Sequence, residues 1–370
     1  MMYVGLDVHE ETTVASFRNA AGQVVKREVV ATSPTALRGM FRGLRGSIRI
    51  ALESGPQAVR VVAILSTKHR HVLVCDGRRN RLLASGTKTD SIDADKLSDL
   101  LRLGALRPVY IGDAHVQQLR CLVHHYSRVT GDRTRALLRL RALLASIGVR
   151  VKGRTSLRTV SLRAVREPSV RFVARALVEQ IKFLTPVLQA AKTRMVAHAA
   201  TDPMFVLLQS CPYIGPIRAA ELLAIVGDAH RFPTSRSFCA YGGLAVEQRV
   251  SSEHRIANGK FVRQSGNLGV RRLNRNGNPR LKSILKDVAL GASLGRGVLR
   301  SLYEAHIERG KRPAIARVAL ARRIASIIYS MWKSAEPFTP ERLKSAIVCS
   351  GRASTDPLVL GPCVSPKVRR

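Results

Sequence analysis

The chain has 370 residues, of which 45% are hydrophobic, so it is long enough for two or three folded domains and too apolar for a disordered protein. Its 62 lysines and arginines outnumber its 25 aspartates and glutamates, and the resulting net charge of +37 predicts a polyanionic partner, in the first place nucleic acid. A membrane protein, a secreted protein and a disulfide or zinc scaffold are disfavoured, because arginines interrupt the longest apolar stretch, the first residues turn acidic at once, and the six cysteines form no CxxC pair.

Residues 1–112 alternate between strand-like and helix-like patterns. Strands are expected at 2–8, 13–20, 24–30, 47–54 and 71–76, and helices at 33–46, at 56–69 with Pro56 in the first position, and within 88–104. Three hairpin strands followed by strand–helix units predict a mixed α/β sheet with helices packed on it.

The remainder of the chain has mainly helical patterns. Residues 113–200 carry 17 lysines and arginines against four acids and have long helical periodicity, which predicts a basic helical hairpin or coiled coil. Residues 201–335 are expected to form a compact, mostly helical region around one irregular basic loop. Residues 336–370, rich in Pro, Gly and Ser, are expected to be disordered. The predicted fold class is therefore α/β plus all-α.

Acidic residues stand out in so basic a chain. Asp7 and Glu53 come at the ends of two expected strands, and Asp90 and Asp93 have the i, i+3 spacing that places both on one face of a helix. An ordinary explanation exists for each one, because Asp often caps a turn and acids favour a helix start. Together they predict a site where carboxylates converge and bind divalent cations, for which Mg²⁺ with its preference for oxygen ligands is the best candidate. Two such ions can hold the attacking and leaving oxygens of a phosphoryl displacement.

Four segments carry a resemblance to a known family: YVGLDVHEETTVASF, IALESGPQAVRVVAIL, HVLVCDGRRNRLL and GTKTDSIDADKLSDLLRLGALRP. They resemble the RuvC-like amino-terminal domain of the DEDD-type insertion-sequence transposases, a family that also includes Piv-type DNA invertases and bridge-RNA-guided recombinases. The resemblance implies a ribonuclease H-like fold in which Asp7, Glu53, Asp90 and Asp93 are the catalytic, metal-binding acids. It also implies a bacterial-type cytoplasmic, nucleoid-associated protein, which agrees with reduced cysteines.

Residues 207–232 read as a helix, a tight Pro/Gly turn and a second helix. Gly215 would let a phosphate approach the backbone amides of the second helix, as in a helix-hairpin-helix, although a plain structural hairpin is the competing interpretation. The family resemblance continues through this segment, which looks like the carboxy-terminal transposase domain.

The segment 254–286 contains nine lysines and arginines and no acid, and it is rich in Gly and Asn. A mixture of this kind favours a loop that approaches a phosphate backbone over an ordinary solvated face. The residues predicted to contact DNA or RNA, here and in the hairpin, are Gly215, Arg263, Arg271, Arg272, Arg275 and Lys282.

Within this segment, Ser265 precedes Gly266 and has Arg263, Arg271 and Arg272 near it in sequence. The family resemblance implies a nucleophilic serine in an SG motif upstream of a K/R-x-G-N segment, which favours Ser265. The family's usual spacing from the tyrosine of AYxGL, counted here from Tyr241, instead favours Ser251, with Ser252 beside it. Both alternatives stay open from the sequence.

These patterns predict a transposase or site-specific DNA recombinase. The resemblance implies DNA as partner, a structured guide RNA if the chain is one of the RNA-guided members, and a homodimer or homotetramer without membrane contact. The alternatives are a Piv-type DNA invertase, a RuvC-like nuclease that hydrolyses branched DNA with the acids alone, and a non-catalytic nucleic-acid-binding protein.

Overall fold

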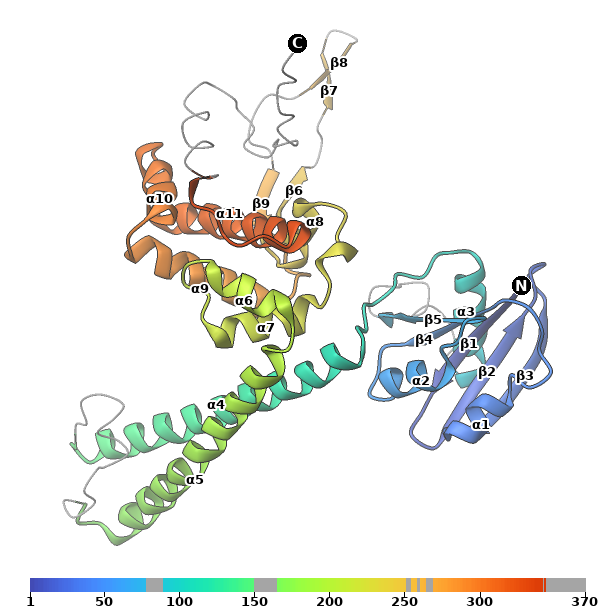
Figure 1. Ribbon diagram of the computed structural model, residues 1–370, viewed down its shortest axis with the longest axis horizontal. Helices are drawn as coiled ribbons and strands as arrows, with labels where there is room; N and C mark the ends of the chain where they lie inside the picture. The colour runs from blue at the N-terminus through green and yellow to red at the C-terminus, as the bar shows by residue number, and fades with distance from the viewer. Residues whose placement is uncertain are drawn as a thin grey trace. The chain divides into compact units, whose positions relative to one another are not determined.

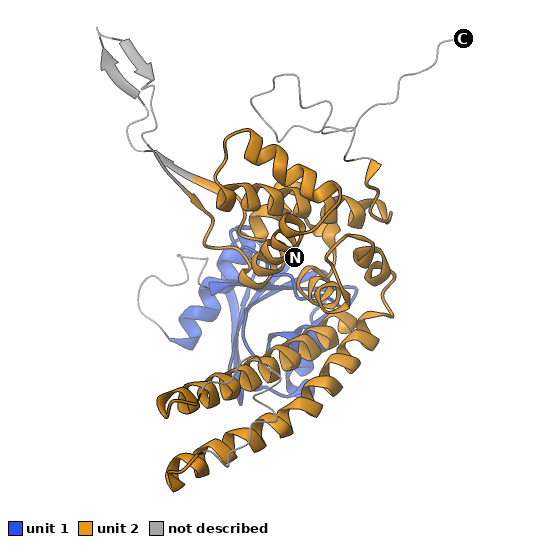
Figure 2. Cartoon of the chain, turned by 90° about the vertical axis from the view of Figure 1, so that its left-hand side faces the viewer, with its two compact units in different colours: residues 1–113 blue, residues 114–370 orange. Residues whose placement is uncertain are grey.

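The computed structural model describes residues 1–77, 89–149, 165–250, 254–257, 260–263, 269–341 and 343. The chain divides into two compact units, Met1–Asp113 and Ala114–Arg370 (Figure 2). No helix in the described ranges combines the length and the apolar character needed to cross a bilayer.

A five-stranded sheet forms the centre of the first unit. β1 (Met2–Val8), β2 (Thr12–Arg18) and β3 (Val24–Ala31) pair antiparallel, whereas β4 (Ile48–Glu53) and β5 (Arg70–Cys75) continue the sheet parallel to β1. The strand order is β3-β2-β1-β4-β5 (Figure 1). The mixed sheet predicted from the sequence is therefore confirmed.

Each face of this sheet has its own hydrophobic core, because alternate residues of a strand point to opposite faces. One core contains Leu6 and packs against the helices α1 (Pro34–Gly39) and α2 (Ala58–Leu65). The other contains Ala51 and packs against α3 (Asp90–Arg102). Odd-numbered residues of β1 and β4 thus belong to the face that α3 covers.

Two predicted helices begin or end at different residues in the structure. The helix expected over 33–46 ends at Gly39, and the chain then turns at Gly43 and Gly46, whose φ angles are +78° and +87°. The helix expected from Pro56 begins at Ala58, because Pro56 lies in the preceding turn.

Two long helices, α4 (Ala114–Ser146) and α5 (Pro168–Ala199), open the second unit and pack side by side (Figure 1). Their shared core consists of small and branched side chains, mainly Ala136, Leu137, Leu140, Leu144, Ala174, Val178 and Ile181. A hydrogen bond also links the two helices, because the Arg133 Nε donates to the Thr185 hydroxyl at 3.2 Å.

Shorter helices make up the rest of the second unit. They are α6 (Pro203–Ser210), α7 (Pro216–Val226), α8 (Ser235–Tyr241), α9 (Pro279–Leu294), α10 (Val298–Glu308) and α11 (Pro313–Ser334), with a 3₁₀ turn at Ala229–Arg231. Residues from all six helices contribute to one large core, in which Leu320, Ile324 and Ile328 of α11 are fully buried.

The basic segment expected as one irregular loop instead contains two short antiparallel strand pairs. β6 (Val246–Val250) pairs with β9 (Gly269–Leu273), and β7 (His254–Ala257) pairs with β8 (Lys260–Arg263). The sequence signal for this was present, because Asn-Gly separates the two apolar-alternating stretches that become β7 and β8, and this dipeptide is typical of hairpin turns. Residues 342 and 344–370 of the expected disordered tail lie outside the described residues.

Candidate active site

Asp7 lies near the end of β1, on the face that α3 covers. Two residues earlier on the same face, Gly5 is in direct contact with the backbone of α3. A Cβ atom on Gly5 would lie 2.1 Å from the Ala94 carbonyl oxygen and 2.6 Å from the Ser98 nitrogen. Because glycine has no side chain, α3 can pack closely enough to place its first turn beside Asp7.

The first turn of α3 is fixed by Thr89. Its hydroxyl accepts a hydrogen bond from the Ile92 amide at 3.3 Å, and its carbonyl accepts one from the Asp93 amide at 2.9 Å. Asp90 and Asp93 therefore both lie in the first turn, where carboxylates also interact favourably with the helix dipole.

Three side chains meet between β1 and α3. The His9 Nε2 atom lies 3.2 Å from Asp7 Oδ2 and 3.5 Å from Asp90 Oδ2. One ligand atom from each of Asp7, His9 and Asp90 falls within 4.8 Å of the others, so these residues could share a metal ion. We call these three residues the acidic cluster.

The electrostatics of the acidic cluster favour a bound cation. Partial burial raises the pKa of Asp7, His9 opposes this, and the neighbouring carboxylates of Asp90 and Asp93 raise it further. Within the described ranges, neither Asp7 nor Asp90 has a lysine or arginine within ion-pair distance. Carboxylate oxygens that repel one another in partly exposed space fit a hard divalent ion, and the donor set therefore suits Mg²⁺ or Mn²⁺.

His9 was not identified as a site residue from the sequence. It follows Asp7 by two positions, the spacing that puts side chains on the same face of a strand. That periodicity, applied one step beyond the strand end, would have indicated it.

Glu53 occupies the corresponding end of β4. Because Leu6 pairs with Leu52 in the parallel ladder, Asp7 and Glu53 are the next residues on adjacent strands. The Glu53 carboxylate lies over Gly77, where a Cβ atom would be only 2.6 Å from Oε2. Asp7 and Glu53 thus share a sheet edge, but the Glu53 oxygens are not part of the acidic cluster.

The other two acids of α3 have structural partners. Arg27 of β3 donates to Asp95 from Nε at 3.1 Å and from Nη2 at 2.7 Å. Partial burial acts to raise the pKa of Asp95, but hydrogen bonds from Arg27 and Ser16 outweigh it and lower the pKa below its ordinary value. Asp99 accepts from Arg102 Nη2 at 2.9 Å. The Arg27–Asp95 pair, together with Arg18 of β2, whose Nε lies 3.8 Å from Asp99 Oδ1, holds α3 against the β2–β3 hairpin.

Gly215, predicted to approach a phosphate, is the residue immediately before α7. No atom lies within 4 Å of the position a Cβ would take, so the space beside it is open, and its φ of −82° does not itself require glycine. The unusual backbone in this turn belongs to Tyr213, whose φ is +68°. Its ring packs on Gly291 and Gly295 of α9, where a Cβ on Gly295 would overlap the Tyr213 hydroxyl.

The predicted DNA- or RNA-contacting cations cluster in sequence around the β6–β9 pair. Arg272 lies on β9, Arg275 is exposed, and the Lys282 Nζ donates to the Asn274 carbonyl at 3.3 Å. Arg263 and Arg271 lie on β8 and β9, and their side chains are outside the described residues, as are Ser265, Ser251 and Ser252 in full.

Close backbone contacts join the two ends of this basic segment, which we call its base. Gly243 and Gly277 touch through their backbones, since a Cβ on Gly277 would lie 2.3 Å from the Gly243 Cα. The Asn278 amide donates to the Tyr241 carbonyl at 2.6 Å, and the Asn274 amide to the Ala245 carbonyl at 2.8 Å. The AYGGL and NRNGNP segments are therefore joined where the chain leaves and re-enters the helical body.

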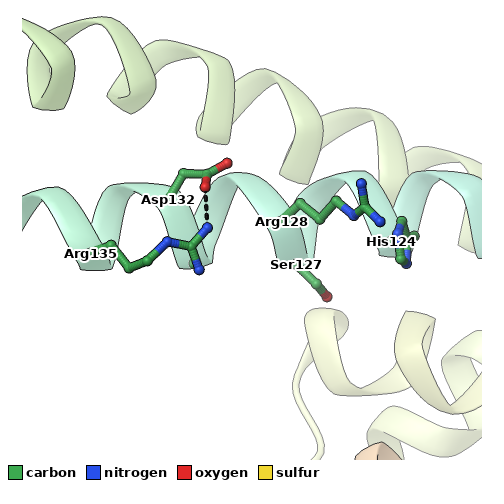
Figure 3. Close-up of a pocket in the computed structure, with 6 residues that line it drawn as sticks. His124, Ser127, Arg128, Asp132 and Arg135 are labelled. Carbon is green, nitrogen blue, oxygen red and sulfur yellow. Dashed lines mark hydrogen bonds and ion pairs between the residues drawn. The ribbon is translucent and has the colours of Figure 1, made fainter.

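A cleft of about 520 Å³ lies along the exposed side of α4 in the second unit (Figure 3). Arg135 is paired with Asp132 there, whereas the Arg128 and His124 side chains lie close to each other without such a pair in the view. The lining residues are His124, Ser127, Arg128, Gly131, Asp132 and Arg135. Two of the lining side chains are arginines, so the cleft offers cationic groups.

Comparisons with known proteins show similarity to transposases over most of the chain. A family model described as a DEDD transposase of IS110 type matches residues 4–149, and a model of the IS116/IS110/IS902 transposase family matches residues 206–304. A putative transposase of Sinorhizobium fredii is 27% identical over 68% of this chain and 64% of its own length, so the chain spans less than two thirds of that relative. A probable family 20 transposase of Pseudomonas aeruginosa is 25% identical over 66% of this chain and 72% of its own. An uncharacterized protein of insertion element IS110 from Streptomyces coelicolor is 24% identical over 89% of this chain and 93% of its own.

We expect Gly5→Ala to destabilise the fold, because the added methyl group would overlap the α3 backbone. Overpacking of this kind costs about 1–3 kcal/mol in the free energy of unfolding. Urea denaturation followed by circular dichroism measures it. Gly39→Ala is the control, because nothing lies within 4 Å of its Cβ position. Equal stability of the two variants would mean that α3 does not pack on Gly5 as described.

We also expect Arg27→Gln to lower the melting temperature at neutral pH, because Asp95 loses its partner. The folded-state pKa of Asp95 lies below its ordinary value, so this contribution is complete above the ordinary pKa and is lost as the pH falls through the lowered one. The difference from the parent chain should therefore shrink on acidification. Lys26→Gln, which removes a neighbouring pair with Glu28 on the same strand, is the control that should show no link to α3. A pH-independent difference for Arg27→Gln would contradict the assignment.

Proposed function

Because this chain belongs to the IS110 family of DEDD insertion-sequence transposases, we propose that it cuts and rejoins DNA at the ends of an insertion sequence. The observation that supports this most strongly is the meeting of Asp7, His9 and Asp90, contributed by a strand and a helix that are far apart in sequence. A surface with a net charge of +37 provides the complementary attraction for DNA.

In this proposal Asp7, Glu53, Asp90 and Asp93 hold divalent cations, with Mg²⁺ as the physiological ion. The bound ions would stabilise charge on the attacking and leaving oxygens of a phosphodiester. His9 orients the cluster, because its Nε2 hydrogen bond to Asp7 Oδ2 directs the other oxygen of that carboxylate away from the ring. Glu53 joins from the adjacent strand end if its carboxylate turns from Gly77 toward Asp7.

The proposed nucleophile is Ser265, with Ser251 as the alternative. Its Oγ would form a bond to phosphorus while the bond from phosphorus to a deoxyribose oxygen breaks, and that oxygen would leave with a proton. Arg263, Arg271 and Arg272 would stabilise the negative charge that develops on the phosphate. The joined Gly243–Gly277 base supports this, because it anchors the serine-containing segment to a rigid body.

Each region of the chain has a proposed role in this reaction. We propose that residues 1–112 form a ribonuclease H-like catalytic domain and 113–200 a coiled-coil linker that mediates dimer or tetramer contacts. Residues 201–335 would form a DNA-binding domain in which α6, α7 and the turn before Gly215 act as a helix-hairpin-helix. A structured guide RNA is a further proposed partner for the cationic surface, which includes the cleft on α4, and the protein would act in the cytoplasm at the nucleoid.

Metal binding tests the acidic cluster directly. We expect Asp7→Asn and Asp90→Asn each to weaken Mn²⁺ binding, measured by isothermal titration calorimetry, by about tenfold or more, and His9→Gln by about tenfold through the lost orientation. Asp132→Asn, which removes an acid already paired with Arg135, is the matched control and should bind as the parent chain does. If all four variants bind alike, the metal lies elsewhere.

A covalent trapping assay distinguishes the two serines. Incubation with a labelled DNA duplex that carries the element's own end and Mg²⁺ should give a protein–DNA adduct on a denaturing gel. We expect Ser265→Ala to abolish the adduct and Ser251→Ala to retain it. The reverse outcome would assign Ser251, and cleavage without any adduct would instead favour a hydrolytic, junction-resolving nuclease.

A further inference from the structure

Cations gather at one edge of the central sheet of the first unit. Between residues 29 and 75 the sequence contains seven lysines and arginines, and its only acid is Glu53. Glu53 lies at the carboxyl end of β4, whereas several of the cations lie in the turns that lead into the amino ends of β4 and β5. We call the basic residues of these two turns the basic edge: Arg42, Arg45, Lys68, His69 and Arg70.

Backbone hydrogen bonds place the two turns side by side. The Ile48 amide, at the start of β4, donates to the His69 carbonyl at 2.9 Å. In the second turn, Thr67 and Arg70 pair through two backbone hydrogen bonds of 3.2 Å, which leaves Lys68 and His69 at the tip. Both of these side chains are exposed.

Arg70 connects the second turn to the first. Its guanidinium carbon lies 5.3 Å from the centroid of the Phe41 ring, and Phe41 is buried beside Phe17 in the core of the unit. A cation over an aromatic ring is attracted by the ring electrons, so this contact fixes the guanidinium close to the backbone of Arg42, the residue after Phe41. The Arg70 Nη1 atom is buried and has no hydrogen-bond acceptor among the described residues.

Two glycines give the first turn its shape. Gly43 and Gly46 are the left-handed residues noted above, and no atom lies within 4 Å of the position that a Cβ would take at either one. The turn is therefore open on its outer side, where Arg42 and Arg45 are exposed. A bulky polymer can approach the backbone of this turn as well as its side chains.

The basic edge differs from the other cations of this unit in its charged neighbours. Lys26 pairs with Glu28 at 2.6 Å, Arg27 with Asp95 at 2.7 Å and Arg102 with Asp99 at 2.9 Å. By contrast, no carboxylate of the described residues lies within ion-pair distance of any side chain of the basic edge. Closely spaced cations of this kind complement the phosphates of a polyanion.

The basic edge and the acidic cluster lie at opposite ends of the same sheet. β4 runs from Ile48, beside the basic edge, to Glu53, and its six residues span about 20 Å at about 3.3 Å per residue. A single phosphodiester cannot touch both sites. A polynucleotide at the basic edge would therefore be held through phosphates other than the one at the acidic cluster, and this contact needs no metal ion.

We propose that the basic edge binds backbone phosphates of a polynucleotide without the help of divalent metal ions. The inference rests on the proposed function for the presence of a nucleic-acid partner, and it adds a binding surface to the first unit away from the candidate active site. Arg42, Arg45 and Lys68 donate to phosphate oxygens, and Arg70 holds the two turns together beneath them. DNA and RNA share the phosphodiester chemistry that these groups recognise.

The salt dependence of binding in EDTA tests the proposal. Fluorescence anisotropy of the full chain is measured with a DNA duplex and, separately, with a structured RNA, between about 50 and 200 mM salt. Loss of one phosphate contact lowers the steepness of log K against log salt by about 0.9 for a duplex, so over this range a variant should lose about 3.5-fold less affinity than the parent chain. We expect Arg45→Gln and Lys68→Gln each to have this effect.

Two control variants separate a local contact from a general effect of charge. Arg45→Lys keeps the positive charge and should bind with the slope of the parent chain. Lys26→Gln removes one positive charge from the same unit, but a charge that is paired with Glu28, and should also leave the slope unchanged. All four substituted side chains are exposed, so the melting temperature by circular dichroism should stay at the parent value.

The outcomes separate this proposal from the proposed function. A lowered slope for DNA, RNA or both supports the basic edge and identifies the polymer. The inference is overturned, and the proposed function stands, if Arg45→Gln and Lys68→Gln keep the parent slope, if Lys26→Gln lowers it as much, or if binding requires added Mg²⁺. If the two variants lower the slope for RNA and the parent chain does not bind DNA, the proposed function fails and the basic edge remains. Binding to neither polymer, with or without Mg²⁺, overturns both.

Discussion

The close contact between Gly5 of β1 and the backbone of α3 is the constraint on which the candidate active site depends. A helix normally packs on a sheet through side chains, about 10 Å away. Here the Ala94 carbonyl and the Ser98 amide reach the strand itself, so the packing on β1 sets the position of the start of α3. Asp7 and Asp90, which are 83 positions apart in the sequence, therefore become neighbours.

The four acids of α3 differ in their charged neighbours along the helix. Asp95 and Asp99 face arginines of the hairpin and of α3 itself, and their charges are neutralised within the fold. Asp90 and Asp93 lie one turn earlier, next to Asp7, and their charges remain to be balanced, apart from a marginal Asp93–Lys96 pair at 4.0 Å. The paired acids fix the helix, and Asp90 and Asp93 are the ones for which we propose metal binding.

Much of the first unit follows from the sequence because its patterns are local. Alternation in MYVGLDV and the apolar run IRIAL predict strands, and i, i+3 spacing predicts that Asp90 and Asp93 share a helix face. The order of the strands could be anticipated from the hairpin and crossover pattern. Three features could not: that Gly5 is a packing contact, that His9 joins the acidic cluster, and that Glu53 lies over Gly77. Each depends on which side chains meet across elements, and no local pattern contains that information. The strand pairs within 246–273 were missed for a different reason, because the abundance of Gly, Asn and Arg outweighed a short β-branched alternation.

Gly243 and Gly277 are in direct backbone contact. The stability of the helical body therefore depends little on the length of the segment between these two glycines. Since both ends of the intervening segment are fixed at one point, lengthening it costs only loop-closure entropy, about 0.6 kcal/mol for each doubling. The extra stretch of about fourteen residues that separates Ser265 from Ser251 is then a change of reach and not of fold. The length of the segment between Gly243 and Gly277 can therefore change while the helical body that anchors both of its ends stays the same.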